Sequence, residues 1–159
     1  MEELSAPEPL SHKHILQDFD SGSVPIDRWL KTKARAAVAQ RTAKVFVVCK
    51  GEVVVGYFAL ASSRLRIEEL PEALASGLPK HPIPTVLLAR LGVHRQYQGS
   101  GLGKALVADA VARALASNEN VASFALITNA KLESRSFYLK LGFKESPADP
   151  TLLVMSLVF

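Results

Sequence analysis

Three glycines, Gly99, Gly101 and Gly103, fall within five residues and are followed at once by Lys104 and a helical pattern. Glycine adopts positive φ without a Cβ penalty, so its backbone can approach a ligand closely. The N-terminus of a helix also carries partial positive charge, because its first N–H groups have no partner in the helix. We therefore predict an anion site held by the backbone amides of Gly99, Gly101, Leu102 and Gly103.

Two common phosphate motifs do not fit this spacing. A P-loop has four residues between its glycines and a Ser or Thr after the lysine. Here three residues separate Gly99 from Gly103, and Ala105 follows Lys104, so no hydroxyl is placed for magnesium. A dinucleotide fingerprint needs Gly-x-Gly-x-x-Gly and an acidic residue on a second strand end, and this chain has neither. The prediction is a pyrophosphate cradle without a metal; a merely flexible turn would need only one glycine.

The patterning along the chain predicts the elements that must position this turn. In the first half of the chain we expect a helix after the turn at 20–23, a hairpin around 50–52, and a proline-rich loop over 68–84 with at most one short helix. A buried strand over 85–93 and the helix from Leu102 then enclose the glycine turn. A strand over 121–128, a helix over 129–143 closed by Gly142, and a final strand over 151–159 complete the chain. This order predicts an α+β protein with a single mixed sheet and a central βαβ unit, and one domain over residues 1–159.

Composition limits the classes of protein. No apolar run approaches the ~20 residues that span a bilayer. The N-terminus is acidic and bears prolines, unlike a signal peptide, so we expect a cytoplasmic protein. The lone cysteine, Cys49, excludes an internal disulfide and is expected to be a buried strand thiol.

The net charge of +4 favours an anionic partner. Basic residues between Arg28 and Lys44 follow one another without an acidic residue among them. They form either a solvated helix face or a surface that meets phosphates.

At the glycine turn the residues carry a family resemblance. Gln96-Tyr97-Gln98-Gly99-Ser100-Gly101 matches the Gln/Arg-x-x-Gly-x-Gly/Ala acetyl-CoA motif of the GNAT N-acetyltransferases, and "SRSFYLKLGF" resembles their last-helix signature. With "FDSGSVPIDRWLKTKARAA", "VVGYFAL" and "TLLVMSLVF", the chain resembles, over nearly its whole length, the acetyltransferase toxins of bacterial toxin–antitoxin pairs, which acetylate the amino acid on charged tRNA. His94 departs from the aspartate usual there, and Ser21 from a common cysteine.

This resemblance implies a GNAT-type twisted sheet flanked by helices, and roles for individual residues. Tyr138 takes the position of the general acid, and the backbone N–H of Val93 that of the oxyanion donor. Acetyl-CoA, with no metal, is implied to lie against Leu91, Val93, Arg95, Gln96, Gln98, Gly99, Ser100, Gly101, Leu102, Gly103, Lys104, Asn129 and Phe137. The competing interpretation of Tyr138 is a core aromatic, a role that Phe137 and Phe143 are expected to fill better.

No general base is evident in the sequence, since Glu68, Glu69 and His94 are not diagnostically placed. A lysine ε-amine (pKa ~10.4) would need a base at pH 7, whereas an α-amine has a pKa near 8. Esterification of its carboxylate lowers that pKa further, so an aminoacyl ester supplies neutral amine without help.

The residues expected to contact tRNA phosphates are Arg28, Lys31, Lys33, Arg35 and Arg90. The resemblance further implies a homodimer and a ribbon-helix-helix antitoxin. Two other functions stay open at this point. One is an acetyltransferase for a small amine or a protein N-terminus, and the other is a non-catalytic module that binds acyl-CoA or a partner protein.

Overall fold

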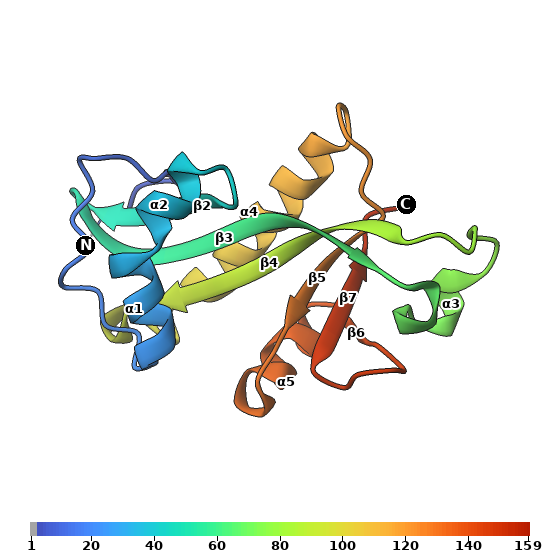
Figure 1. Ribbon diagram of the computed structural model, residues 1–159. Coiled ribbons are helices and arrows are strands. Elements are labelled where there is room, and N and C mark those ends of the chain that lie inside the picture. Colours follow the sequence, from blue (N-terminus) through green and yellow to red (C-terminus); the bar gives the residue numbers. More distant parts are fainter. Residues whose placement is uncertain (1–2) are drawn as a thin grey trace. The chain divides into compact units, whose positions relative to one another are not determined.

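The computed structural model describes residues 3–159. Its strands are β1 (Glu8–Pro9), β2 (Lys44–Lys50), β3 (Val53–Leu65), β4 (Ile83–Val93), β5 (Ala125–Asn129), β6 (Lys144–Glu145) and β7 (Leu152–Ser156). Its α-helices are α1 (Val24–Thr32), α2 (Ala34–Ala39), α3 (Glu72–Ala75), α4 (Leu102–Ser117) and α5 (Leu132–Lys140), and its 3₁₀ turns are η1 (Ile67–Glu69) and η2 (Arg95–Tyr97) (Figure 1). None of the helices in this range is long and apolar enough to cross a membrane.

The strands form a mixed seven-stranded sheet in the order β1-β2-β3-β4-β5-β7-β6, which confirms the predicted α+β class. β2 and β3 make the expected hairpin, with Gly51 at a φ of 62° in its turn. β4 and β5 are parallel and α4 connects them, as the predicted βαβ unit requires.

Several boundaries differ from the predictions. The helix expected after residue 23 is two helices, because Lys33 leaves helical geometry (φ −122°, ψ −28°) between α1 and α2. The predicted loop over 68–84 overlaps the end of η1 and contains α3, and β4 already begins within it at Ile83. β5 begins only at Ala125. β1 and β6 have two residues each and had no signal in the sequence.

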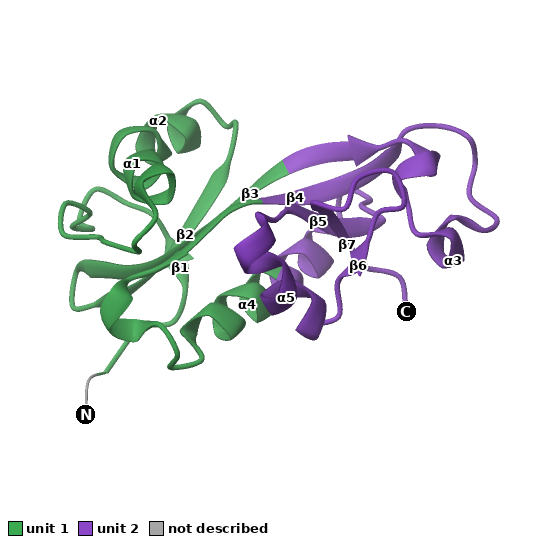
Figure 2. Ribbon diagram, turned by 90° about the horizontal axis from the view of Figure 1, so that it is seen from below, with its two compact units in different colours: residues 1–61, 89–110 green, residues 62–88, 111–159 purple. Residues whose placement is uncertain are grey.

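The chain divides into two compact units (Figure 2). The first runs up to Ala61 and includes Ala89–Ala110; the second comprises Ser62–Leu88 and Val111–Phe159. That residues 1–159 form one domain stays a prediction, and the first two of those residues lie outside the described range.

In the first unit, α1 and α2 cover one face of β2 and β3 (Figure 1). Leu30 and Ala34 from the helices are fully buried against Val47, Cys49 and Tyr57. On the opposite face, a Cβ at Gly56 of β3 would meet the side chains of Leu102 and Leu106 of α4. The sheet of this unit is therefore covered on both faces, which explains the continuous apolar run of β2.

In the second unit, a separate core joins β3, β4, β5 and β7 to the loop that holds η1 and α3. Its buried residues are Leu65, Leu70, Ile83, Ala125, Ile127, Leu152 and Val154. α5 lies beside β5 and β7 (Figures 1 and 2) and buries Tyr138.

Gly92, near the end of β4, is a close-packing position. A Cβ there would lie 2.6 Å from Cγ2 of Ile26, 3.0 Å from Cε1 of Tyr57 and 3.2 Å from Cζ of Phe19. We expect Gly92→Ala to lower the free energy of unfolding by ~1–3 kcal/mol, because the β-branched and aromatic neighbours cannot all move aside. Urea denaturation measures the change.

Gly56→Ala is the matched control. Its Cβ would meet only the ends of two leucine side chains, at 3.1 and 3.2 Å, which can shift by rotation. Equal destabilisation by both substitutions would contradict this account of Gly92.

Candidate acetyl-CoA site and catalytic tyrosine

Gly99 and Gly101 shape the turn that leads into α4. Their φ values are +79° and +91°, a region that side-chain-bearing residues rarely adopt. A Cβ built on either glycine meets nothing within 4 Å. These glycines are therefore required by the backbone conformation, and the space beside them is open.

The backbone amides at the start of α4 face out of the helix. Ala105 N–H donates to Gly101 O at 3.0 Å, which starts the helical ladder. The N–H groups of Leu102, Gly103 and Lys104 precede that bond and have no carbonyl in the helix to accept from them. The first turn of α4 contains no acidic residue. This end of α4 therefore suits an anion, and the pyrophosphate site at Gly99, Gly101, Leu102 and Gly103 stays a prediction.

Two other amides of the motif are already used within the turn. Ser100 N–H donates to Tyr97 O (3.3 Å), and Gln96 N–H donates to Nδ1 of His94 (3.2 Å). His94 therefore caps η2, a structural role that the sequence did not suggest.

The end of β4 presents backbone groups on the edge away from β3. His94 N–H donates to Val55 O of β3 at 2.8 Å. Because successive N–H groups of a strand point to opposite edges, those of Leu91 and Val93 point the other way. Val93 O agrees with this direction, since it accepts from Nε2 of Gln98 at 2.9 Å. The register of β4 with β5 covers only Thr85–Leu87, so Leu91 and Val93 lie beyond it.

Gln98 and Arg95 fasten the glycine turn to the segment before α1. Gln98 Nε2 also donates to Ser21 O at 2.7 Å. Arg95 pairs through Nε with Oδ2 of Asp20 at 2.9 Å, and its N–H donates to Asp20 O. The Arg95 side chain hydrogen-bonds to the Asp20 carboxylate and so lowers its pKa. These two side chains thus have partners within the chain, and contacts from them to acetyl-CoA stay predictions.

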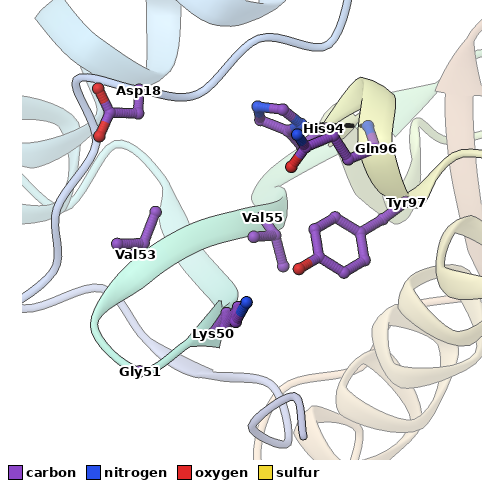
Figure 3. A pocket seen from close by; sticks show the side chains of 8 residues that line it. All are labelled: Asp18, Lys50, Gly51, Val53, Val55, His94, Gln96 and Tyr97. Carbon is purple, nitrogen blue, oxygen red and sulfur yellow. Dashed lines mark hydrogen bonds between the residues drawn. The ribbon is translucent and has the colours of Figure 1, made fainter. Parts of the chain in front are cut away.

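The segment just before the glycine turn lines a cavity of about 680 Å³ that faces the β2–β3 hairpin (Figure 3). Gln96 and Tyr97 line it from η2, Val53 and Val55 from β3, and Lys50 from the end of β2. Gln96 therefore faces this cavity while its amide is bound to His94. A direct contact between Gln96 and the donor likewise stays a prediction.

Tyr138 lies on the buried face of α5, with 7% of its surface exposed. It makes edge-to-face contacts with the rings of Phe137 and Phe143, at centroid distances of 5.0 and 5.4 Å. Burial raises the pKa of Tyr138 to about 12, and a hydrogen bond with the Thr128 side chain acts in the opposite direction. The phenol is therefore neutral at physiological pH and has a proton to donate.

The expectation about the neighbouring aromatics is only half correct. Phe143 is buried, with 3% exposed, whereas Phe137 is only partly buried. Consecutive helix positions are turned by about 100°, so the face that buries Tyr138 leaves Phe137 near the surface. Asn129, another predicted contact of acetyl-CoA, is exposed at the end of β5.

The predicted tRNA-binding residues fall into two groups. Arg28, Lys31 and Lys33 are exposed on and just after α1. Arg35 instead donates from Nη2 to His14 O (2.6 Å) and Ser11 O (3.4 Å). Arg90 is half-buried, with Cζ 5.5 Å from the ring centroid of Trp29, which is itself only partly buried. We therefore take the first three as the exposed basic group.

One set of three side chains among residues 3–159 could in principle hold a metal ion: Glu8, His14 and Cys49. Ser11 N–H donates to Nδ1 of His14 (2.9 Å), so the ring proton is on Nε2, which donates to Glu8 Oε1 (2.7 Å). A metal ligand would need the opposite tautomer. Burial also raises the pKa of Cys49 to about 11, which keeps the thiol protonated. Hydrogen bonds from Ser11 to His14 and from His14 to Glu8 thus explain why these side chains lie together without a metal ion. That the enzyme uses no metal cofactor stays a prediction.

The candidate bases gain no support from their contacts. Glu69 accepts from Arg66 N–H at 2.8 Å, Glu68 is exposed, and Nδ1 of His94 accepts from the N–H of Gln96.

One residue near the predicted acid was not identified from the sequence. Thr128 reads as an ordinary strand position, and only the packing of α5 on β5 brings it to Tyr138.

The chain is similar to proteins of one known family. Residues 41–145 match the acetyltransferase (GNAT) domain. The chain is 35% identical to the tRNA-acetylating toxin of Mycobacterium tuberculosis over 152 residues, covering 95% of this chain and 91% of that one.

Two solved structures share the fold over nearly the whole chain. AtaT complexed with acetyl-methionyl-tRNAfMet has a TM-score of 0.90 and 26% identity, covering 97% of this chain and 95% of that one. A tyrosine-to-phenylalanine mutant of the AtaT toxin, bound to the C-terminus of the antitoxin AtaR and acetyl-CoA, has a TM-score of 0.82 and 25% identity, covering 98% and 94%. The chain is an N-acetyltransferase and belongs to the GNAT family.

Proposed function

We propose that this enzyme transfers the acetyl group of acetyl-CoA to the α-amine of the amino acid on aminoacyl-tRNA, and so blocks translation. The observation that carries this proposal is the 35% identity with a tRNA-acetylating toxin across 95% of the chain. The complex of the similar toxin AtaT with acetyl-methionyl-tRNAfMet supports the same class of substrate.

The residues at the start of α4 fit acetyl-CoA as the donor. Open space lies beside Gly99 and Gly101, the amides of Leu102, Gly103 and Lys104 precede the first helical hydrogen bond, and the first turn of α4 contains no acidic residue. We assign these amides to the pyrophosphate. Bound acetyl-CoA would supply a thioester, which is an acyl group activated for attack by an amine.

Leu91 and Val93 orient the donor through the exposed edge of β4. An extended arm can pair with a strand edge as a further strand does. The Val93 N–H is assigned to the acyl oxygen, where negative charge develops during attack. One such donor contributes ~10²–10³ in rate.

Tyr138 is assigned as the general acid that protonates the departing thiolate. Its raised pKa keeps the phenol protonated, and its O–H can give up that proton when a stronger base is formed beside it. No base is assigned, because the α-amine of an aminoacyl ester is largely neutral near pH 7–8. Arg95, Gln96, Gln98, Ser100, Asn129 and Phe137 remain proposed contacts of the donor.

The exposed basic group is assigned to tRNA phosphates. We expect the triple substitution Arg28→Ala/Lys31→Ala/Lys33→Ala to weaken tRNA binding. The slope of log K against log salt should become shallower by ~0.7–0.9 for each lost phosphate contact. Binding titrations between 50 and 300 mM salt measure that slope. Substitution of the exposed Lys80 and Lys144 by alanine is the control, and this variant should keep the slope of the parent enzyme. An unaltered slope in the triple variant would show that the exposed basic group is a solvated helix face that does not contact tRNA phosphates.

We further infer that an antitoxin restrains the enzyme, because the similar AtaT toxin has been solved with its antitoxin AtaR. We also propose that the antitoxin is a ribbon-helix-helix protein, that the enzyme is a homodimer and that it is located in the cytoplasm. The antitoxin type and the homodimer follow from the resemblance to toxins of toxin–antitoxin pairs, and the location follows from the composition of the chain.

A cell-free translation reaction tests the functional consequence. Adding the enzyme with acetyl-CoA should arrest peptide synthesis, and adding the enzyme with CoA in its place should not. Fresh aminoacyl-tRNA should restore synthesis after the enzyme is removed. Translation that continues in the presence of enzyme and acetyl-CoA would contradict the proposed function.

A further inference from the structure

Arg90, near the end of β4, is a half-buried arginine that lies against an aromatic ring of α1. Its Cζ is 5.5 Å from the ring centroid of Trp29. Trp29 stacks in turn on Tyr57 of β3, with ring centroids 6.2 Å apart and an interplanar angle of 6°. Tyr57 is fully buried, and its hydroxyl donates to Ile26 O at 2.8 Å. Two stacked rings thus connect the Arg90 side chain to the core of the first unit, to which all four residues belong.

The Arg90 guanidinium has no acceptor oxygen within residues 3–159. It contacts the Trp29 ring and forms neither an ion pair nor a hydrogen bond there, unlike Arg95, which pairs with Asp20. A guanidinium is always charged and carries only N–H donors. An arginine that is partly withdrawn from water is normally paired with a carboxylate or another anion. The N–H donors of Arg90 therefore suit an anion that is not part of the chain.

The elements around Arg90 contain almost no acidic residues. α1, α2 and β4, all within the described range, include one acid, Asp27. Its carboxylate accepts from the hydroxyl of Ser21 at 2.6 Å and from the Ser21 N–H at 3.0 Å, which holds it at the start of α1. The exposed basic group lies on the same helix and directly after it. One helix thus carries both this group and the ring under Arg90, which favours an extended anion with several phosphates.

The position of Arg90 on β4 matches the distance of one particular phosphate. Val93, whose N–H is assigned to the acyl oxygen, follows Arg90 by three residues, which is about 10 Å at ~3.3 Å per residue. In an aminoacyl-tRNA, about eight covalent bonds of ~1.5 Å join the α-amine to the phosphorus of the terminal nucleotide, so these two groups lie within about 10 Å of each other. The phosphates of the preceding nucleotides lie farther away.

We propose that Arg90, held by Trp29, binds the phosphate of the terminal nucleotide of tRNA and so positions the α-amine beside Val93. This inference rests on the proposed function and names the part of the substrate that is recognised. An arginine binds a phosphate through two parallel N–H···O bonds, and contact with an aromatic ring restricts the guanidinium before the substrate arrives. Trp29 is a positioning residue, because it acts through Arg90. Polyamines and peptide N-termini lack this phosphate, so the contact selects an amine carried by a nucleotide.

Two substrate analogues test the contact directly. Both are aminoacyl-adenosines in which an amide replaces the labile ester, and one of them also carries the phosphate of the terminal nucleotide. Their amino acid is one that the enzyme acetylates on bulk charged tRNA. We expect the parent enzyme to acetylate the phosphorylated analogue with a kcat/KM at least about 10-fold higher. In Arg90→Gln both analogues should react equally, at the rate of the parent enzyme with the analogue that lacks the phosphate.

Matched variants separate recognition from folding. Arg64 is an exposed strand arginine of β3 in the second unit, and Arg64→Gln should keep the full preference for the phosphorylated analogue. Trp29→Leu should lose part of the preference, because it removes the ring and keeps an apolar side chain against the core. Trp29→Phe should retain most of it. Thermal unfolding of each variant shows whether it is folded. Each analogue is also titrated as a competitor of charged tRNA, so that slow turnover does not hide a difference in affinity.

Three results would overturn this proposal and leave the proposed function standing. The first is an equal response of the parent enzyme to both analogues. The second is a folded Arg90→Gln variant that keeps the full preference. The third is an Arg90→Gln variant that keeps the preference and has a raised Kd for acetyl-CoA, which would assign the guanidinium to a phosphate of the donor. If the parent enzyme acetylates no charged tRNA at all, the proposed function is wrong and this inference falls with it.

Discussion

Replacing Tyr138 by phenylalanine is expected to lower kcat for acetyl transfer by ~10²–10³-fold, since a positioned general acid contributes at least this much. Phenylalanine keeps the ring contacts with Phe137 and Phe143 and loses only the hydroxyl. The leaving thiolate must then take its proton from water that has not been positioned. The Kd of acetyl-CoA should stay within a factor of about two, because the glycine turn that is assigned to the pyrophosphate is untouched.

Stopped-flow or steady-state assays give kcat, and calorimetric titration gives Kd. Tyr57→Phe is the matched control, because Tyr57 is fully buried and its hydroxyl donates to Ile26 O at 2.8 Å. That variant should lose ~1 kcal/mol of stability and keep its kcat. A Tyr138→Phe enzyme with normal turnover would show that the phenol is only part of the core.

Replacing Gly101 by aspartate is expected to raise the Kd of acetyl-CoA about 10- to 100-fold. The φ of +91° at this position strains any residue with a Cβ, which would reorient the amides that follow. The new carboxylate would also enter the open space beside the turn, where we place the pyrophosphate. Like charges at that distance oppose binding, and high salt should recover part of the loss.

Gly77→Asp separates local strain from the loss of the anion site. Gly77 has a φ of +81°, and a Cβ there meets nothing within 4 Å, yet it lies in the loop after α3. It should lose a similar amount of stability and bind acetyl-CoA normally. Equal affinity in Gly101→Asp and the parent enzyme would exclude this turn as the pyrophosphate site.

The glycine turn could be predicted from the sequence because few residues other than glycine accept the backbone angles of Gly99 and Gly101. The central βαβ unit could also be predicted from the sequence, because its buried strands and its amphipathic helix have clear and different hydrophobic patterns. The short strands β1 and β6 could not be predicted, because a segment of two residues is too short to show a periodic pattern. The break at Lys33 had no Gly or Pro to mark it; α2 begins there and buries Ala34 in the core.

The parts of the site that depend on tertiary packing could not be predicted from the sequence. Whether Tyr138 or Phe137 faces inward depends on the phase at which α5 meets the sheet. Arg35 belonged to the same basic run as Lys31 and Lys33, and only the folded chain brings the carbonyl of His14 to its guanidinium. The Thr128 hydroxyl likewise meets Tyr138 through packing of α5 on β5, which no local pattern encodes.

The most direct measurement of the proposed function follows the acetyl group itself. The purified enzyme is incubated with labelled acetyl-CoA and, in parallel, with bulk aminoacyl-tRNA, deacylated tRNA, polyamines and peptides. Mild base then cleaves the aminoacyl ester, and the released amino acids are analysed by mass. We predict label in N-acetyl amino acids released from charged tRNA, and none in deacylated tRNA. Label that enters polyamines or peptides and never charged tRNA would contradict the account.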